Sequence, residues 1–269
     1  MTEKAYAKIN VTLEVLGKKG NFHDLESFIV PINIYDTLTF SLSDEDQVVC
    51  NIDIKDNNIL KAIKLFKETY QINDHVKVDL NKQIPIGAGL GGSSADISAT
   101  LRGLNRLFNL NKPLKDLEPL ANQLGSDTLF CLYNKRAFIY GRGDHIHFYD
   151  SDDKLSFLII MPTVSLLTKD VFQTYQLYKD KQTYIGFEPF LKENDMDFII
   201  KNAKNDLLQP ALHLSQPLNK MYDKLKNEGL HVHMSGAGSS LFIINPTNQE
   251  IKRVKNMCEN TLIEFSQEI

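Results

Sequence analysis

Hydrophobic and polar residues alternate in the first part of the chain. Over residues 9–15 every second residue is apolar, with polar residues between. A period of two turns successive side chains to opposite faces, so the pattern predicts a half-buried β-strand. Residues 28–32 and 37–42 predict two further strands, and Pro31 indicates an edge or a bulge in the first of them.

The period changes to that of a helix over residues 58–70, where apolar residues share one face and lysines occupy the other. Residues 76–80 alternate again and predict a strand. A glycine-rich segment comes next and leads into a second amphipathic helix, whose apolar stripe comprises Ile97, Leu101, Leu104 and Phe108. A short helix is predicted around residues 117–124, ending at Gly125.

Residues 151–154 form the most polar short break near the middle of the chain. The domain boundary is therefore predicted there, giving one domain over 1–152 and another over 153–269. Helices and strands alternate without strict βαβ regularity, which favours an α+β fold over a doubly wound sheet. Beyond the break, strands are predicted near 155–161, 241–244 and 262–265, and helices near 168–178, 218–225 and 250–258.

Composition narrows the possible partners. The 269 residues include 30 basic and 34 acidic side chains, a net charge of −4, so we expect no nucleic-acid partner. No apolar run reaches the roughly 18 residues that a membrane span needs, so we expect no membrane partner. The three cysteines lack metal-ligand spacing and no targeting signal is visible, which together predict a cytoplasmic protein.

Residues 85–94 are rich in glycine and serine and lie between a predicted strand and a predicted helix. Glycines allow a tight turn that approaches a ligand closely, and the helix directs free N–H groups and its positive dipole end at that turn. Ser93 and Ser94 add hydroxyls that can donate to phosphate or ligate Mg²⁺. The segment therefore predicts a phosphate site, the alternative being a turn that only allows close helix packing.

The spacing Gly87-x-Gly89-x-x-Gly92 formally matches a dinucleotide-binding fingerprint, but its context differs. In dinucleotide-binding folds that carry this fingerprint, the strand runs directly into the glycines, whereas residues 81–85 intervene here. The preceding strand also alternates, unlike a strand buried on both faces. No lysine follows the glycines, which excludes a Walker A loop.

Three single residues are candidates for chemistry, although each alone has a simpler explanation. Lys8 interrupts an apolar alternation, and a lone lysine of this kind is usually solvated. His23 follows a basic turn, where a lone histidine is usually incidental. Asp127 precedes an apolar segment and is by itself best explained as a helix cap. The second glycine and serine turn, residues 235–240, either lines a site or simply connects two strands.

Taken together and in this order, these segments resemble the GHMP kinase superfamily, which is named for galactose, homoserine, mevalonate and phosphomevalonate. Its three motifs are similar to residues 7–10, 85–94 and 234–240, and the resemblance runs from about residue 4 to about residue 244. The closest similarity is to the branch that phosphorylates a hydroxyl of 4-diphosphocytidyl-2-C-methyl-D-erythritol in non-mevalonate isoprenoid biosynthesis. It is carried further by residues 21–23, 36–38, 100–105, 125–127, 141–144 and 205–207.

The resemblance implies two α+β domains with the active site in the cleft between them, and ATP with Mg²⁺ as cofactors. It assigns the catalytic base to Asp127 and its partner to Lys8. The substrate would carry a cytidine diphosphate group, bound by Asn10, Phe22, His23, Gly236 and Gly238. The ATP-binding residues would be Pro85, Gly87, Gly89, Leu90, Gly91, Gly92, Ser93 and Ser94, with Ser94 also holding the metal.

The chain departs from the branch pattern at three places. Asn21-Phe22 replaces a glycine and a tyrosine, Ser93-Ser94-Ala95 shifts the serine pair, and Thr128-Leu129 replaces a valine and a proline. Two alternatives therefore stay open. One is a GHMP kinase for another small alcohol, such as mevalonate or a sugar, and the other is a nucleotide-binding homologue without turnover.

Overall fold

The computed structural model describes residues 1–20, 22–54, 57–258 and 261–269, with the side chains of Lys19 and Phe22 outside this description. The chain forms two compact units. Unit 1 comprises Met1–Lys8, Ile34–Ile84 and Gly91–Lys135, and unit 2 comprises Ile9–Asn33, Pro85–Leu90 and Arg136–Ile269. Each unit combines helices with β-sheet, which confirms the α+β class. The sequence boundary after residue 152 and the expected cleft between domains stay predictions.

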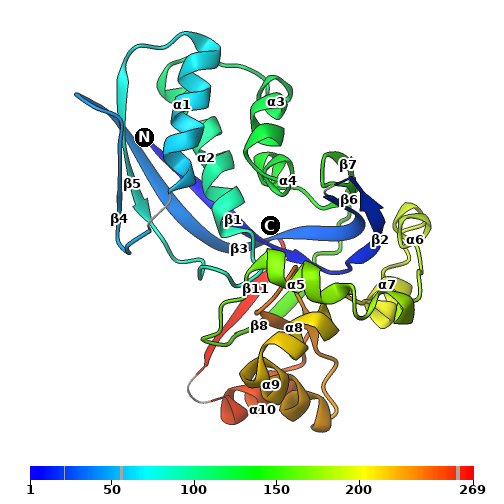
Figure 1. Ribbon diagram of the computed structural model, residues 1–269. Helices are drawn as coiled ribbons and strands as arrows, with labels where there is room; N and C mark the ends of the chain where they lie inside the picture. Colours follow the sequence, from blue (N-terminus) through cyan, green and yellow to red (C-terminus); the bar gives the residue numbers. More distant parts are fainter. Residues whose placement is uncertain (21, 55–56, 259–260) are drawn as a thin grey trace. The chain divides into compact units, whose positions relative to one another are not determined.

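Unit 1 packs helices against a sheet in which β4 pairs parallel to β5 and β5 pairs antiparallel to the second half of β3. Helix α2 contacts α1, α3 and α4, and all four helices are visible in Figure 1. The elements that lie wholly or partly in unit 1 are β1 (Thr2–Asn10), β3 (Phe22–Ser43), β4 (Gln47–Cys50), α1 (Asn58–Tyr70), β5 (His75–Asn81), α2 (Gly92–Leu107), α3 (Leu114–Leu124) and α4 (Thr128–Tyr133).

Unit 2 contains two sets of strands. The first half of β3 pairs with β2 (Glu14–Lys19) and β6 (Ala137–Gly141), and β6 pairs with β7 (His145–Phe148). A separate sheet has the order β11-β8-β10-β9. Its strands are β8 (Ser156–Met161), β9 (His233–Met234), β10 (Leu241–Ile244) and β11 (Leu262–Gln267); the helices are α5 (Thr168–Tyr175), α6 (Glu188–Lys192), α7 (Met196–Asn202), α8 (Leu208–Leu214), α9 (Gln216–Asn227) and α10 (Asn248–Met257).

The strand predicted over residues 9–15 is wrong in two respects. Strand β1 ends at Asn10, and β2 begins at Glu14. Between them, the N–H groups of Val11 and Thr12 both donate to a single carbonyl on β3, that of Phe28, which interrupts the regular pairing of a strand. The prediction of a half-buried strand also fails, since the polar side chains are buried like the apolar ones. Glu14 is 1% exposed, and its carboxylate accepts the N–H groups of two residues in the loop after α5.

The two strands predicted over 28–32 and 37–42 are one continuous strand, β3. Residues 25–29 of β3 pair with β6, and residues 37–43 pair with β5. Pro31 lies between these two paired stretches. Its missing N–H group therefore removes no hydrogen bond to β5 or β6.

Most other predictions from periodicity are confirmed. Helix α1 has the predicted bounds, β8 is almost wholly buried, and α3 is followed by Gly125 as expected. Within the described residues, none of the helices combines the length and apolar character that a membrane crossing requires.

Candidate active site

Lys8 and Asp127 form an ion pair within unit 1. Lys8 lies on β1 with its side chain 4% exposed, and its Nζ is 3.5 Å from Oδ2 of Asp127. Asp127 occupies the N-cap position of α4, yet its side chain makes no capping hydrogen bond. The interpretation of Lys8 as a solvated lysine is therefore wrong, whereas Asp127 does occupy the cap position of a helix, although without a capping bond from its side chain.

The start of α2 presents backbone donors. Its N-cap residue, Gly91, has a φ of +71°, and no side chain caps the helix. The first helical hydrogen bond runs from the N–H of Ala95 to the carbonyl of Gly91, at 2.9 Å. The N–H groups of Gly92, Ser93 and Ser94 therefore have no acceptor within the helix, which is the arrangement that binds phosphate at helix N-termini.

The aliphatic part of Lys8 passes directly against this helix start. A Cβ atom on Gly91 would lie 2.9 Å from Cγ and 3.0 Å from Cε of Lys8. Only glycine fits there, both for this close approach and for the positive φ. The Lys8–Asp127 pair and the donors of α2 are therefore neighbours in unit 1.

The two serines at the start of α2 have different environments. The exposed Ser93 accepts a hydrogen bond through Oγ from Nδ2 of Asn58, at 3.1 Å. Ser94 is half-buried, and its Oγ lies 3.7 Å from where a Cβ atom on Gly125 would be. Ser94 therefore lies beside residues 125–127, called the Asp127 loop below, whereas Ser93 is bonded to α1.

A buried charge cluster, which the sequence analysis missed, supports the start of α2. The ammonium of Lys82 donates to the carboxylates of Asp36 and Asp96, and lies 2.7 Å from Oδ2 of Asp96. It also lies 2.9 Å from where a Cβ atom on Gly92 would be. The sequence did point to Asp36, because residues 36–38 resemble a family segment. It gave no reason to select Lys82, which is a lone lysine after a strand.

The charged groups of this cluster shift one another's pKa values. Burial alone would lower the pKa of Lys82, but the charges of Asp96 and Asp36 outweigh it and raise that pKa. Burial also raises the pKa of Asp96 to about 7, although the charge of Lys82 opposes this shift. Asp36 makes further hydrogen bonds in this cluster, since its Oδ1 accepts the N–H groups of Gln83 and Ile84.

In unit 2, the two glycine turns bond to each other. The N–H of Ser240 donates to the carbonyl of Ala88 at 3.0 Å, and Oγ of Ser235 donates to the carbonyl of Gly89 at 3.0 Å. A Cβ atom on Gly89 would lie 2.2 Å from the carbonyl oxygen of Ser235, so the close approach requires glycine. The turn over residues 235–240 connects β9 to β10 and also supports the first glycine turn.

The remaining predicted ATP and substrate residues of the two turns contribute mainly backbone. Gly87, Gly236 and Gly238 all have positive φ. A Cβ atom on Gly87 would overlap Oγ of Ser165 at 2.1 Å. Leu90 is 1% exposed and belongs to the core, and Pro85 is half-buried.

His23 lies against an aromatic residue that the sequence analysis did not select. Its ring stacks on that of Phe172 in α5, with centroids 4.5 Å apart and planes 22° from parallel. Burial, and then the charge of Lys18, lower the pKa of His23, which favours the neutral ring. Asn21 and the side chain of Phe22 lie outside the described residues, so the predicted role of Phe22 stays a prediction.

Asn10 is held by hydrogen bonds at the end of β1, where it is 4% exposed. Its Nδ2 donates to Oγ of Ser27 at 2.8 Å, and its N–H donates to Oγ of Ser235 at 3.2 Å. The backbone of Asn10 is therefore tied to the second glycine turn, and its side chain is tied to β3.

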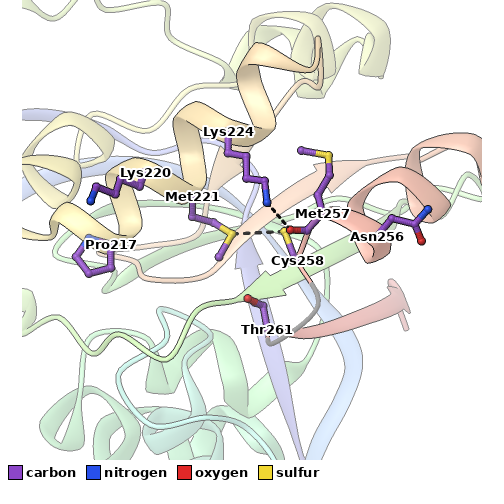
Figure 2. A pocket seen from close by; sticks show the side chains of 8 residues that line it. All are labelled: Pro217, Lys220, Met221, Lys224, Asn256, Met257, Cys258 and Thr261. Atoms are coloured by element: carbon purple, nitrogen blue, oxygen red, sulfur yellow. Dashed lines mark hydrogen bonds between the residues drawn. The ribbon is translucent and has the colours of Figure 1, made fainter.

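A cavity of about 600 Å³ lies elsewhere in unit 2, between α9 and α10 (Figure 2). Sγ of Cys258 and Sδ of Met221 are 3.5 Å apart, and the ammonium of Lys224 donates to the carbonyl of Met257 at 2.6 Å. Burial raises the pKa of the Cys258 thiol, which keeps it protonated. None of the predicted site residues lines this cavity.

Comparison with known proteins agrees with this geometry. Residues 57–135 match the family model described as "GHMP kinases N terminal domain". Two relatives from Staphylococcus aureus, strains MRSA252 and bovine RF122, bear the name "Putative 4-diphosphocytidyl-2-C-methyl-D-erythritol kinase". Each is 33% identical over 268 residues, covering 94% of this chain and 93% of the relative.

Solved structures show the same fold. A crystal structure of 4-(cytidine 5'-diphospho)-2C-methyl-D-erythritol kinase has a TM-score of 0.79 at 23% identity, with all of both chains covered. The mevalonate kinase of Methanococcus jannaschii has a TM-score of 0.70 at 14% identity, covering 100% of this chain and 98% of that one. Together with the relatives found by sequence, these matches place the protein: it belongs to the 4-diphosphocytidyl-2-C-methyl-D-erythritol kinase family, within the GHMP kinases.

Proposed function

We propose that the protein transfers the γ-phosphoryl group of ATP to a hydroxyl of 4-diphosphocytidyl-2-C-methyl-D-erythritol, in the cytoplasm. The observation that carries this proposal is the contact of Lys8 with both Gly91 and Asp127. It brings a base and a cation next to a helix start suited to phosphate. The names of the curated relatives supply the substrate, which the geometry of unit 1 alone does not specify.

The chemistry follows from these positions. Phosphoryl transfer depends mainly on alignment and on stabilising charge. The N–H groups of Gly92, Ser93 and Ser94 would hold the polyphosphate. Asp127 would accept the proton of the attacking hydroxyl, a role worth roughly 10²–10⁴-fold in rate. Lys8 would hold the carboxylate of Asp127 in place through their ion pair and stabilise the developing negative charge on the oxygen.

The residues present also fit Mg²⁺. This ion takes oxygen ligands and in kinases commonly uses one or two protein oxygens together with substrate phosphates. The described residues contain no group of three or more acidic, histidine or cysteine side chains able to hold a metal alone. Oγ of Ser94 is oriented toward the Asp127 loop, and with phosphate oxygens it would complete such a site. When bound, Mg²⁺ would neutralise phosphate charge.

Recognition of the cytidine base would rest on His23 and Phe172. An aromatic face accepts a stacked base, and a neutral imidazole has one donor and one acceptor. Nε2 of His23 lies 3.3 Å from Nε2 of Gln176, so Nδ1 would be the nitrogen that meets the base edge. The stack of His23 on Phe172 and the lowered pKa of His23 supply both features.

The test is turnover with a matched variant. Purified protein with ATP, Mg²⁺ and the diphosphocytidyl substrate should release ADP, and Asp127→Asn should lower kcat by roughly 10²–10⁴-fold while ATP still binds. Asp116→Asn, which changes an exposed carboxylate on α3, should retain wild-type kcat.

A folded protein that binds ATP and turns over mevalonate or a sugar instead would reject the cytidine substrate. Protein that binds ATP and turns over none of these alcohols would support a homologue without catalysis.

A further inference from the structure

The hydroxyl of Ser235 connects three segments of unit 2, which are the end of β1, the first glycine turn and its own second glycine turn. Ser235 is fully buried, and its Oγ accepts the N–H of Asn10 at 3.2 Å and donates to the carbonyl of Gly89 at 3.0 Å. The main chain of Ser235 adds two bonds within its own turn. Its carbonyl accepts the N–H of Gly238 at 2.9 Å, and its N–H donates to the carbonyl of Ser240 at 3.1 Å.

These bonds use the hydroxyl as both donor and acceptor. A serine hydroxyl has a single O–H, so the proton given to Gly89 leaves the oxygen lone pairs for Asn10. Full burial keeps bulk water from replacing either bond. A displacement of the Gly89 turn is therefore transmitted through one oxygen atom to the end of β1.

Deleting the hydroxyl would break this connection at one point. Gly89 cannot compensate by moving closer, because it already contacts the carbonyl of Ser235 so closely that only glycine fits. Burial and hydrogen bonding of this kind specify one arrangement of the two turns.

We propose that Ser235 is a positioning residue that couples the nucleotide site to the acceptor-substrate site, through its hydrogen bonds to Gly89 and Asn10. The inference rests on the proposed function, which assigns Gly89 to ATP and Asn10 to the substrate. Nucleotide bound at the Gly89 turn stabilises the arrangement in which Asn10 is held for the acceptor. The coupling is reciprocal, so the acceptor strengthens nucleotide binding by the same factor.

The test measures this factor by calorimetry. The Kd of the diphosphocytidyl substrate is determined with and without the non-hydrolysable analogue AMPPNP and Mg²⁺. Wild-type protein should show a coupling of roughly fivefold or more, within the usual range for linked sites. Ser235→Ala should bring it below about twofold.

Ser239→Ala is the matched control. Ser239 lies in the same turn and is equally buried, but its hydroxyl donates to the carbonyl of Val164, outside the Asn10–Ser235–Gly89 connection. It should retain wild-type coupling. Wild-type coupling in Ser235→Ala, equal loss in both variants, or no coupling in the wild type would each overturn the inference. Absence of nucleotide and substrate binding in the wild type would overturn the proposed function as well.

A second measurement needs no variant and covers the case in which Ser235→Ala does not fold. Amide exchange of wild-type protein is followed by NMR as AMPPNP and Mg²⁺ are added, without the acceptor. The amide of Asn10 should exchange several-fold more slowly once nucleotide is bound, because its acceptor is then held more rigidly. An Asn10 amide that nucleotide leaves unchanged contradicts the coupling.

Discussion

Two adjacent hydroxyls at the start of α2 differ in what they can ligate. Ser94 faces the Asp127 loop, whereas Ser93 is bonded to Asn58. We expect Ser94→Ala to raise by roughly tenfold or more the Mg²⁺ concentration needed for half-maximal activity, and to weaken Mn²⁺ binding in the presence of ADP, read by electron paramagnetic resonance.

Ser93→Ala serves as the control for this prediction and should change both quantities by less than about twofold, since its hydroxyl is directed at α1. Equal effects of the two substitutions would contradict the assignment of the metal to Ser94.

How far single residues could be predicted depended on whether they carry a local signal. Glycine and serine at a strand-to-helix transition are such a signal, because backbone conformation and helix polarity act locally. Lys8 and Asp127 are 119 positions apart, and only resemblance selected them before the ion pair was seen. Lys82 and Phe172 were missed because each acts through partners distant in sequence.

Helix α2 contains a glycine whose role is packing and not flexibility. A Cβ atom on Gly103 would lie 2.4 Å from Cε2 and 2.5 Å from Cζ of Phe40, on β3. Alanine favours helix by about 1 kcal/mol over glycine, but overpacking a core costs typically about 1–3 kcal/mol. We therefore expect Gly103→Ala to lower the free energy of unfolding by up to about 2 kcal/mol, measured by urea denaturation.

Gly229→Ala is the matched control, because Gly229 has open space but a φ of +74°. Its expected cost, roughly 1–2 kcal/mol, comes from backbone conformation alone. The distinction is structural: Gly103→Ala should displace the ring of Phe40, seen as shifted aromatic resonances, and Gly229→Ala should not. A Gly103→Ala protein more stable than the wild type would refute the packing argument.

At the scale of elements, amphipathic periodicity predicted α1, α2, α9 and α10 well, because each buries one face of a helix. It failed over residues 9–15, where polar side chains are buried against partners elsewhere in unit 2. The short helices α4, α6, α7 and α8 were not predicted. Helices of this length are stabilised by tertiary packing, which no local pattern records.

For the whole molecule, the net charge of −4 says little about individual sites. Several charges are buried and locally compensated: Arg136 and Glu268, for example, are each 5% exposed at their side chains and form an ion pair. Removing one partner of such a pair leaves an unpaired buried charge. Charge counting therefore predicts no nucleic-acid partner, but it carries no information on the individual cations of the candidate site.

The stability of the whole molecule should depend on pH through His233, on β9. Burial, and then the charge of His231, lower the pKa of His233 from 6.5 to about 4. In the unfolded chain His233 therefore binds a proton below about pH 6.5, whereas in the folded chain it does so only below about pH 4. The resulting stability is fully present above pH 6.5 and is lost as pH falls to 4, a loss of about 2–3 kcal/mol.

Urea unfolding at pH 7, 6, 5 and 4.5 measures this loss by comparison with His233→Phe, which replaces the ring with one that cannot titrate. Other titrating groups act equally in both proteins, so the difference isolates His233. The variant should lose less stability toward pH 4.5 than the wild type. His231→Asn should retain most of the wild-type loss, because burial is the larger cause of the shift. Identical pH profiles for wild type and His233→Phe would show that His233 is protonated at little cost in the folded protein.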